Sequence, residues 1–390
     1  MTNQRRRAPD GVEPPPLASA ARAASAKEVA NRLSRVEALY AKGRFEEALA
    51  LGESILDRDP PAKIRGKLRH VIAMAALQLG RMERGEELLE QARPEIVAAG
   101  DVLTIVELMT TEAIMAEMRQ RPEAVALAEQ SLAACRRLEP VPRSLEVRAL
   151  NAVAAAKLAA GDWRGAVDAY EVAIERTASL YDMSRQARLL TNVSIAYREL
   201  GQPHRSLVYA TRSVELLETL RDFVSLARSE NNLALSCMAC DDFASARRHL
   251  MRSLELCEQT NLELGRSHVL LSLCELNVAE ARYVEAFKFA KRALVSAESQ
   301  GERSSIAHAH MWLGRVASSL DQPDVADSEF EAALRQLTHA GDNAELVRCH
   351  AWYADALERR GDLQRAYEHV KGAVAHATRT RTKPDSRGIL

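Results

Sequence analysis

Basic side chains recur along this 390-residue chain at steps of forty residues. The positions that form this row, termed the basic ladder below, are Arg148, Arg188, Arg228, His268, His308 and Arg348. Earlier in the chain the same register holds Lys67 and Glu107. A row of guanidinium and imidazole groups could attract an acidic ligand through its summed field. The alternative is a solvated helix face that pairs with nearby acids such as Glu146, Glu230 and Glu345.

Asparagines lie one helical turn beyond the ladder. Asn192 and Asn232 follow a ladder arginine by four residues, and Asn151 and Asn231 follow one by three. A side-chain amide can donate to a peptide carbonyl and accept from a peptide N–H, which suits recognition of an extended backbone. The same amides could instead cap or bridge neighbouring helices.

Tryptophan replaces asparagine at this position near the C-terminal end of the chain. Trp312 and Trp352 follow His308 and Arg348 by four residues. They could form an aromatic floor for an apolar side chain of a ligand. Packing against the next helix would explain them equally, so both interpretations stay open.

Nine turn-like segments, spaced almost every forty residues, indicate the elements that position these residues. Their pivot residues are Gly43, Gly80, Gln120, Gly161, Gly201, Asp241, Ala281, Asp321 and Gly361. A fixed period of this length indicates stacked helical units, none of which buries its apolar face alone. Most of the chain is therefore expected to be a binding scaffold.

Helical periodicity follows the pivots. After Gly161, one apolar stripe of a 3.6-residue period comprises Trp163, Ala166, Val167, Tyr170, Ala173 and Ile174. Proline or glycine separates the units, as at Pro60-Pro61 and Gly341-Asp342. We therefore expect each unit to be two antiparallel helices, A and B, with the pivot in the turn between them.

Small residues recur at two positions of each predicted B helix. The first holds Ala48, Gly85, Ala166, Ser206, Ala246, Ala286, Ala326 and Ala366. The second holds Ala92, Ala173, Ser213, Ser253, Ala293, Ala333 and Ala373. Together with Leu313-Gly314, Tyr197 and Asp59-Pro60, this pattern resembles the tetratricopeptide repeat. The small residues and turn glycines favour that family over HEAT-like repeats of the same length, although the third repeat departs from it at Gln120 and Val125.

The resemblance implies an all-α, right-handed solenoid of about nine hairpins over residues 27–380. It also implies that the basic ladder lines the concave groove. Asparagine one turn after a basic residue resembles the peptide-carboxylate clamps of some tetratricopeptide proteins, but the full clamp across three repeats is absent. Similar long repeats occur in bacterial peptide-sensing regulators, in which a DNA-binding or output domain precedes the solenoid. The 26 residues before residue 27 read as a disordered tail too short for a helix-turn-helix, and residues 381–390 as a basic tail.

Composition narrows the remaining function classes. A net charge of −1 argues against a general polyanion binder such as a nucleic-acid protein. No apolar run reaches the length of a membrane span or signal peptide, so we expect a cytoplasmic protein with reduced thiols. Cys237 and Cys240 lack a second ligand pair, which argues against a metal site. No nucleotide-binding, hydrolase or metalloprotease motif occurs in a fitting context, so we expect neither catalysis nor a cofactor.

The predicted function is therefore non-catalytic binding of a peptide or protein segment in the groove, within a bacterial regulatory or assembly system. The central contacts would be Arg188, Arg228, Asn192 and Asn232. As pH falls toward 6, His268 and His308 would each take up a proton and add positive charge to the groove. The full set of candidate groove residues is Arg148, Asn151, Arg188, Asn192, Arg228, Asn231, Asn232, His268, His308, Trp312, Arg348 and Trp352. A scaffold that binds partners through its convex face or end repeats is the alternative, and the oligomeric state stays open.

Overall fold

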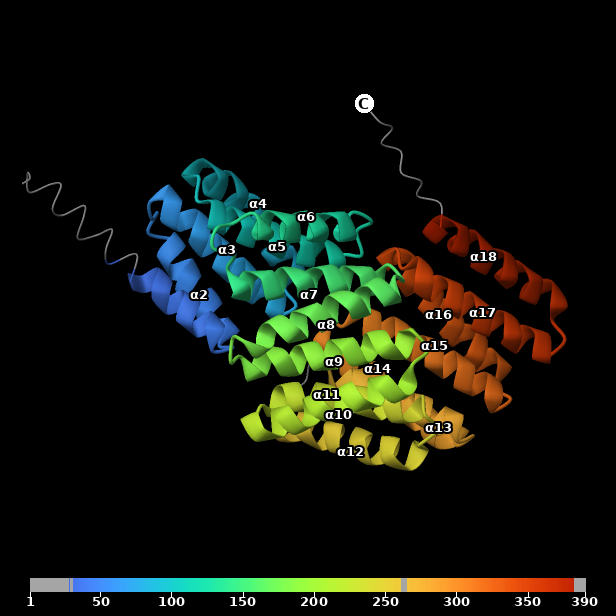
Figure 1. Cartoon of the computed structure of the whole chain (residues 1–390). Coiled ribbons are helices and arrows are strands. Elements are labelled where there is room, and N and C mark those ends of the chain that lie inside the picture. The colour runs from blue at the N-terminus through green and yellow to red at the C-terminus, as the bar shows by residue number, and fades with distance from the viewer. Residues whose placement is uncertain (1–27, 29–30, 261–264, 382–390) are drawn as a thin grey trace, which may run out of the picture. The chain divides into compact units, whose positions relative to one another are not determined.

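The computed structural model describes residue 28, residues 31–260 and residues 265–381. This part of the chain contains helices and no strands (Figure 1). Residues 31–41 are helical. The helices that follow are α2 (Phe45–Leu56), α3 (Ala62–Gln78), α4 (Met82–Ala99), α5 (Val102–Met118), α6 (Ala124–Arg136), α7 (Arg143–Ala159), α8 (Trp163–Ala178), α9 (Met183–Glu199), α10 (Pro203–Leu220), α11 (Phe223–Met238), α12 (Phe243–Gln259), α13 (Arg266–Ala279), α14 (Tyr283–Gln300), α15 (Arg303–Ser319), α16 (Pro323–Ala340), α17 (Asn343–Arg359) and α18 (Leu363–Arg381).

Each predicted pivot lies in a turn between an A helix and a B helix. All nine have a left-handed backbone, with φ between 51° at Gln120 and 85° at Gly361. The residue after the pivot donates its N–H to the carbonyl five residues earlier, as from Gln202 to Tyr197 at 2.9 Å. This is the hydrogen bond of a Schellman motif, which ends helix A and reverses the chain. The predicted turns are therefore confirmed.

The small residues lie where helices A and B approach most closely. Their first set is buried throughout, from fully buried Ala246 to Ala366 with 8% of its surface exposed. A Cβ atom added to Gly85 would come within 2.6 Å of Leu77 Cδ2. Larger side chains would separate the two helices, so the predicted packing positions are confirmed.

The helices form two compact units, residues 1–176 and residues 177–390. Successive helices pack against one another from α2 to α7 in the first unit and from α9 to α18 in the second. The A helices also contact one another: α3 contacts α5 and α5 contacts α7 in the first unit, and α9, α11, α13, α15 and α17 contact one another in order in the second. The A helices therefore form a continuous layer within each unit, and that layer carries the basic ladder.

Two details differ from the sequence-based expectation. Trp163 was expected on the buried stripe, but 43% of its surface is exposed. It is the first residue of α8, outside the helical turns that pack against the neighbouring helices. The basic tail was expected to begin at residue 381, and helix α18 includes Arg381. The predicted tail at 1–26, and that at 381–390 beyond Arg381, lie outside the described residues.

Candidate functional site

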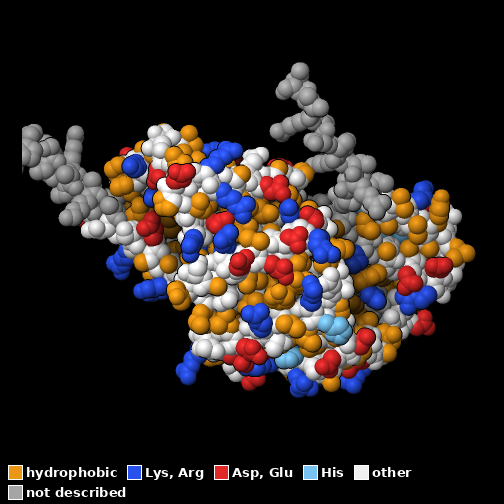
Figure 2. All heavy atoms as spheres, viewed as in Figure 1, with side chains coloured by type: hydrophobic (Ala, Val, Ile, Leu, Met, Phe, Trp, Pro, Cys, Tyr) orange, Lys and Arg blue, Asp and Glu red, His pale blue; other side chains and the backbone are white. Residues whose placement is uncertain are grey.

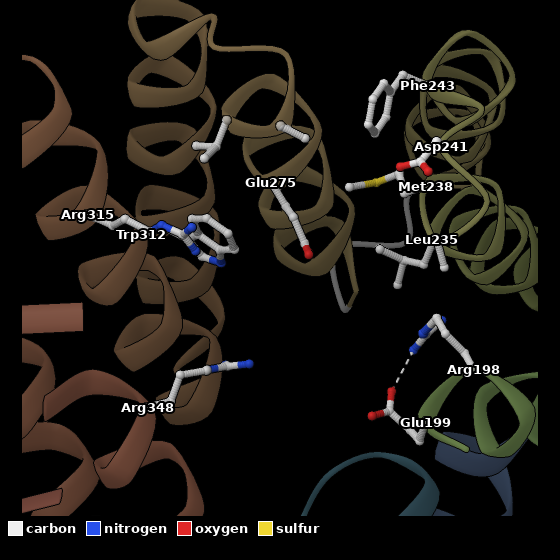
Figure 3. A pocket seen from close by; sticks show the side chains of 13 residues that line it. Arg198, Glu199, Leu235, Met238, Asp241, Phe243, Glu275, Trp312, Arg315 and Arg348 are labelled. Carbon is white, nitrogen blue, oxygen red and sulfur yellow. Dashed lines mark hydrogen bonds and ion pairs between the residues drawn. The ribbon is translucent and has the colours of Figure 1, made fainter. Parts of the chain in front are cut away.

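The second unit holds a pocket of about 560 Å³ on the face of its A helices (Figure 3). The residues that line it are Arg198, Glu199, Leu235, Met238, Ala239, Asp241, Phe243, Glu275, Val278, Ala279, Trp312, Arg315 and Arg348. They come from α9, α11, α13, α15 and α17, with the turn after α11 and the start of α12. One pocket can reach from α9 to α17 only if the A helices curve around it. This face of the unit is therefore concave.

Two indole rings and two guanidinium groups form a cluster at one side of the pocket. The ring centroids of Trp312 and Trp352 are 4.8 Å apart, and the rings are tilted by 57° to each other. The Arg315 guanidinium carbon lies 4.4 Å from the Trp352 ring centroid and 5.2 Å from that of Trp312. Arg348 lies 5.4 Å from the Trp352 ring. Cation–π contacts of this kind hold a guanidinium plane in place while leaving its N–H edges available.

Hydrogen-bonding groups without partners face this pocket. Arg198 Nη2 lies 3.4 Å from Glu199 Oε1, whereas its Nη1 is buried and has no hydrogen-bond partner. Arg315 forms no ion pair with a carboxylate in the described part of the chain. The Glu275 carboxylate points into the same space, as Figure 3 shows, and also forms no ion pair among the described residues. Such groups are satisfied by solvent or by a ligand.

The surroundings of Glu275 shift its titration. Glu275 is exposed on this face, and partial desolvation of its carboxylate by the surrounding helices raises its pKa. Arg198, Arg315 and Arg348 oppose that shift, and Glu199 adds to it. Because arginine keeps its charge at any accessible pH, the proton content of this pocket depends on its carboxylates.

The basic ladder of the second unit is divided between solvated and paired members. Arg188 and Arg228 are exposed and form no ion pair with any described residue. His308 Nε2 lies 3.3 Å from Glu345 Oε2, and Arg348 pairs with the same oxygen at 2.5 Å. Those two contacts fit the alternative of a helix face that pairs with nearby acids, and Arg348 also reaches the pocket.

His268 differs from an ordinary exposed imidazole. One side of it is accessible, but enclosure by the surrounding helices lowers its pKa. The charges of His308 and Arg228 lower it further, and Glu302 opposes them. His268 therefore takes up a proton at a lower pH than the sequence alone suggested.

The predicted asparagines lie on the same A-helix layer but not in the pocket lining. Asn192 is half-buried, and Asn232 is buried with 8% of its surface exposed. No side-chain hydrogen bond of Asn232 occurs among the described residues. The Asn231 Oδ1 atom is buried and likewise lacks a partner. Asn231 and Asn232 thus retain hydrogen-bonding capacity.

The ladder register of the first unit is used internally. Arg148 donates to the Glu107 carbonyl at 2.9 Å and to Thr111 Oγ1 at 3.3 Å. His70 Nε2 lies 2.8 Å from the same Thr111 hydroxyl and is buried. Lys67 lies 3.8 Å from Asp101. Arg148 therefore braces neighbouring A helices, and Asn151 beside it is half-buried.

The cysteines have no environment that would make them reactive. All six are free, and burial raises the pKa of Cys237 to about 11. A thiol with a raised pKa stays protonated at neutral pH and is a poor nucleophile or ligand. Within residues 31–260 and 265–381, no group of three or more His, Cys, Asp or Glu side chains is arranged to hold a metal ion. No described helix is both long and apolar enough to cross a membrane.

Of the residues that sequence reasoning placed in the groove, Trp312 and Arg348 line this pocket, whereas Arg198, Arg315 and Glu275 were missed. Arg315 follows Trp312 by three residues on one helix, so the Trp-x-x-Arg spacing was an available signal. Arg198 and Glu275 belong to different registers of the repeat. Only the curvature of the layer brings them together.

Comparison with known proteins supports the fold. No family model and no curated protein matches the sequence. Among solved structures, a Rap protein complexed with competence and sporulation factor has a TM-score of 0.67 at 13% identity, covering 91% of this chain and 99% of that one. The apo form of the quorum sensor NprR from B. thuringiensis has a TM-score of 0.60 at 14% identity, with 79% and 86% covered. Aspartyl phosphate phosphatase F from Bacillus subtilis has a TM-score of 0.58 at 11% identity, with 93% and 96% covered.

At these identities the likeness concerns the backbone. One of the three proteins is a phosphatase by name, so sharing the fold does not decide whether a chain is catalytic. The predicted fold class is confirmed, and the chain is an all-α solenoid of tetratricopeptide-like hairpins, similar to the Rap and NprR structures.

Proposed function

We propose that the concave A-helix face of the second unit binds an extended peptide or protein segment without catalysing a reaction on it. The observation that carries this proposal is the pocket shared by five successive A helices, lined by tryptophan and arginine. Trp and Arg are the side chains that contribute most to binding free energy at protein interfaces. An extended segment that crosses several A helices would also pass Asn192 and Asn232.

The electrostatic pattern favours a peptide over a nucleic acid. Side chains of both signs are interspersed over the face in view in Figure 2, and the net charge is −1. A polyanion would require a continuous basic surface. A peptide needs only local complementarity, which the Asn231 amide oxygen and the Arg198 guanidinium group, each with a buried atom that lacks a partner, supply.

The test is selection from a phage-displayed library of random octapeptides on the immobilised full-length chain. Three proteins are compared: the wild type, Asn192→Ala/Asn232→Ala, and Gln336→Ala as a control at an exposed position of the B helix α16. Loss of the paired amide contacts should weaken the enriched peptides about tenfold or more. The control should retain wild-type affinity, and all three should melt alike.

Two outcomes would contradict the proposal. One is an absence of enriched peptides above the bare support. The other is equal binding by wild type and the double variant, which would move any binding surface away from these A helices.

A second candidate is a scaffold that binds a partner through its last helix. Leu363, Tyr367, Val370 and Val374 form a stripe on α18, each between 49% and 65% exposed. In α16 the residue equivalent to Val370 is Phe330, which is fully buried. Under this alternative, Tyr367→Arg would abolish partner capture from a native lysate, and the asparagine double variant would not.

A further inference from the structure

We propose that the pocket anchors a carboxylate of the bound peptide at Arg315, beside the Trp312–Trp352 pair, and that Arg198 faces it from the opposite side of the pocket. This inference rests on the proposed function and names the ligand chemistry at one point of the groove. The carboxylate belongs either to an aspartate or glutamate side chain or to the C-terminus of the peptide.

Arg315 is held for such a contact. Two indole faces fix its guanidinium plane at 4.4 and 5.2 Å, so little side-chain freedom is left to lose when a ligand binds. Its N–H groups have no carboxylate partner among the described residues. A planar donor of fixed orientation matches the two oxygens of a carboxylate, which is the geometry of the strongest charge-assisted hydrogen bonds.

Arg198 supplies the second donor. Its Nη1 is buried without a partner, while Nη2 contacts Glu199. A buried charged N–H without an acceptor is unfavourable, and that free energy is recovered when an acceptor enters. In Figure 3, Arg198 approaches the pocket from α9, on the side opposite Trp312, so a ligand group in the pocket lies between the two helices.

The pocket also contains acidic groups, which raises the question of a cationic ligand instead. Of these, Glu199 already contacts Arg198, and Asp241 is exposed at the edge, in the turn after α11. Glu275 is the acid that points inward; it is exposed, its surroundings raise its pKa, and three arginines, Arg198, Arg315 and Arg348, line the same pocket. Arginine cannot lose its charge in the same way. The arginine N–H donors therefore keep their positive charge over the accessible pH range, and they favour an anionic ligand.

The size of the pocket limits what enters. A volume of about 560 Å³ lies within the range of about 300–1,000 Å³ typical of small-molecule sites. It therefore fits one or two residues of a peptide, with the rest of the segment along the A-helix layer. An apolar neighbour of the acidic residue would contact Leu235, Met238 and Phe243.

The experiment uses the octapeptides selected on the wild-type chain. Each is resynthesised in three forms: unchanged, with Glu→Gln or Asp→Asn, and with an amidated C-terminus. Affinities are measured by calorimetry for the wild type, Arg198→Gln, Arg315→Gln, Arg315→Lys and Arg335→Gln. Arg335 is an exposed arginine of α16 and provides the matched control.

We expect acidic residues to be enriched and one neutralised form of each peptide to bind about tenfold or more weakly to the wild type. The same neutralisation should cost less in Arg198→Gln or Arg315→Gln than in the wild type, because one of the two donors is already lost. Arg315→Lys should recover part of the affinity, since charge remains but the planar donor does not. Whether the side-chain form or the amide form weakens identifies the source of the carboxylate.

Equal affinity of acidic and neutralised peptides for the wild type would overturn the inference while leaving peptide binding intact. So would a neutralisation effect of the same size in both arginine variants and in the control. Failure to select any peptide would instead contradict the proposed function, which keeps the two failures distinct. Thermal melting of each variant shows whether it is folded, and the two glutamine variants test the pocket from different helices.

Discussion

The two units use one repeat register in opposite ways. In the first, Arg148 donates to a backbone carbonyl and a threonine on the neighbouring A helix, and Thr111 in turn contacts buried His70. In the second, Arg188 and Arg228 at the same register are exposed without ion pairs to described residues. The repeat therefore specifies where a side chain is placed. Whether that side chain braces the solenoid or remains open to a ligand depends on which hydrogen-bonding groups the neighbouring A helix places within its reach.

The largest expected difference between the units is in stability. Arg148→Ala should destabilise the protein by about 2–3 kcal/mol, because it removes the hydrogen bonds from a charged donor that join α7 to α5. Arg228→Ala should change stability by no more than about 0.5 kcal/mol, as for other exposed side chains. Urea unfolding of both variants, with hydrogen exchange of the α5 and α11 amides, measures the difference. Similar losses of unfolding free energy in Arg148→Ala and Arg228→Ala would contradict the proposed difference between the two units.

Acid should affect the first unit through His70. Burial, assisted by the charges of Arg148 and Lys67, lowers the pKa of His70 to about 3. The unfolded chain binds a proton near the ordinary pKa of about 6.5. Stability is therefore lost as pH falls below about 6.5 toward 3, by about 2 kcal/mol at pH 5.

The measurement is urea unfolding at pH 7 and pH 5 for the wild type, His70→Gln, and His339→Gln as an exposed control. His70→Gln should lose less stability between the two pH values than the wild type, and the control should lose as much. An equal pH effect in all three proteins would show that His70 is not the group responsible.

The turns differ between the units as well. In the first unit the only non-glycine pivot is Gln120, whereas the second has Asp241, Ala281 and Asp321 in the left-handed region. Alanine is strained there, at φ 57°, so Ala281→Gly should raise stability by about 0.5–1 kcal/mol. Asp321→Gly should gain less, because aspartate tolerates this conformation better. Thermal unfolding distinguishes them, and a loss for Ala281→Gly would contradict this account.

The turns and the small packing positions could be predicted from the sequence because both depend on local geometry that repeats. A pivot needs a left-handed residue and a close helix contact needs a small one, so the period alone locates them. The pocket could not be predicted in the same way. Glu275 and Arg315 occupy one register and Arg198 another, and the period does not show which of these side chains lack a partner. That property depends on the curvature of the whole layer.

The smallest effect concerns Glu275, and it probes the open face of the second unit most directly. An ionised Glu275 would repel the carboxylate that we place at Arg315, facing Arg198. Partial desolvation by the surrounding helices raises the pKa of the exposed Glu275, and Glu199 adds to the shift, while Arg198, Arg315 and Arg348 oppose it. As pH falls through that raised pKa, Glu275 takes up a proton and the repulsion disappears. Affinity for an acidic peptide should therefore increase with falling pH, as long as the peptide carboxylate stays ionised.

Glu275→Gln should reproduce the protonated state at neutral pH. We expect about two- to fivefold tighter binding of acidic peptides at pH 7 and a flatter pH dependence, with no change for the neutralised peptides. Calorimetry of both peptide forms at several pH values measures this. Tighter binding of acidic and neutral peptides alike would mean that glutamine acts through packing. Weaker binding of the acidic peptide would mean that Glu275 orients the arginines rather than competing with the ligand for them.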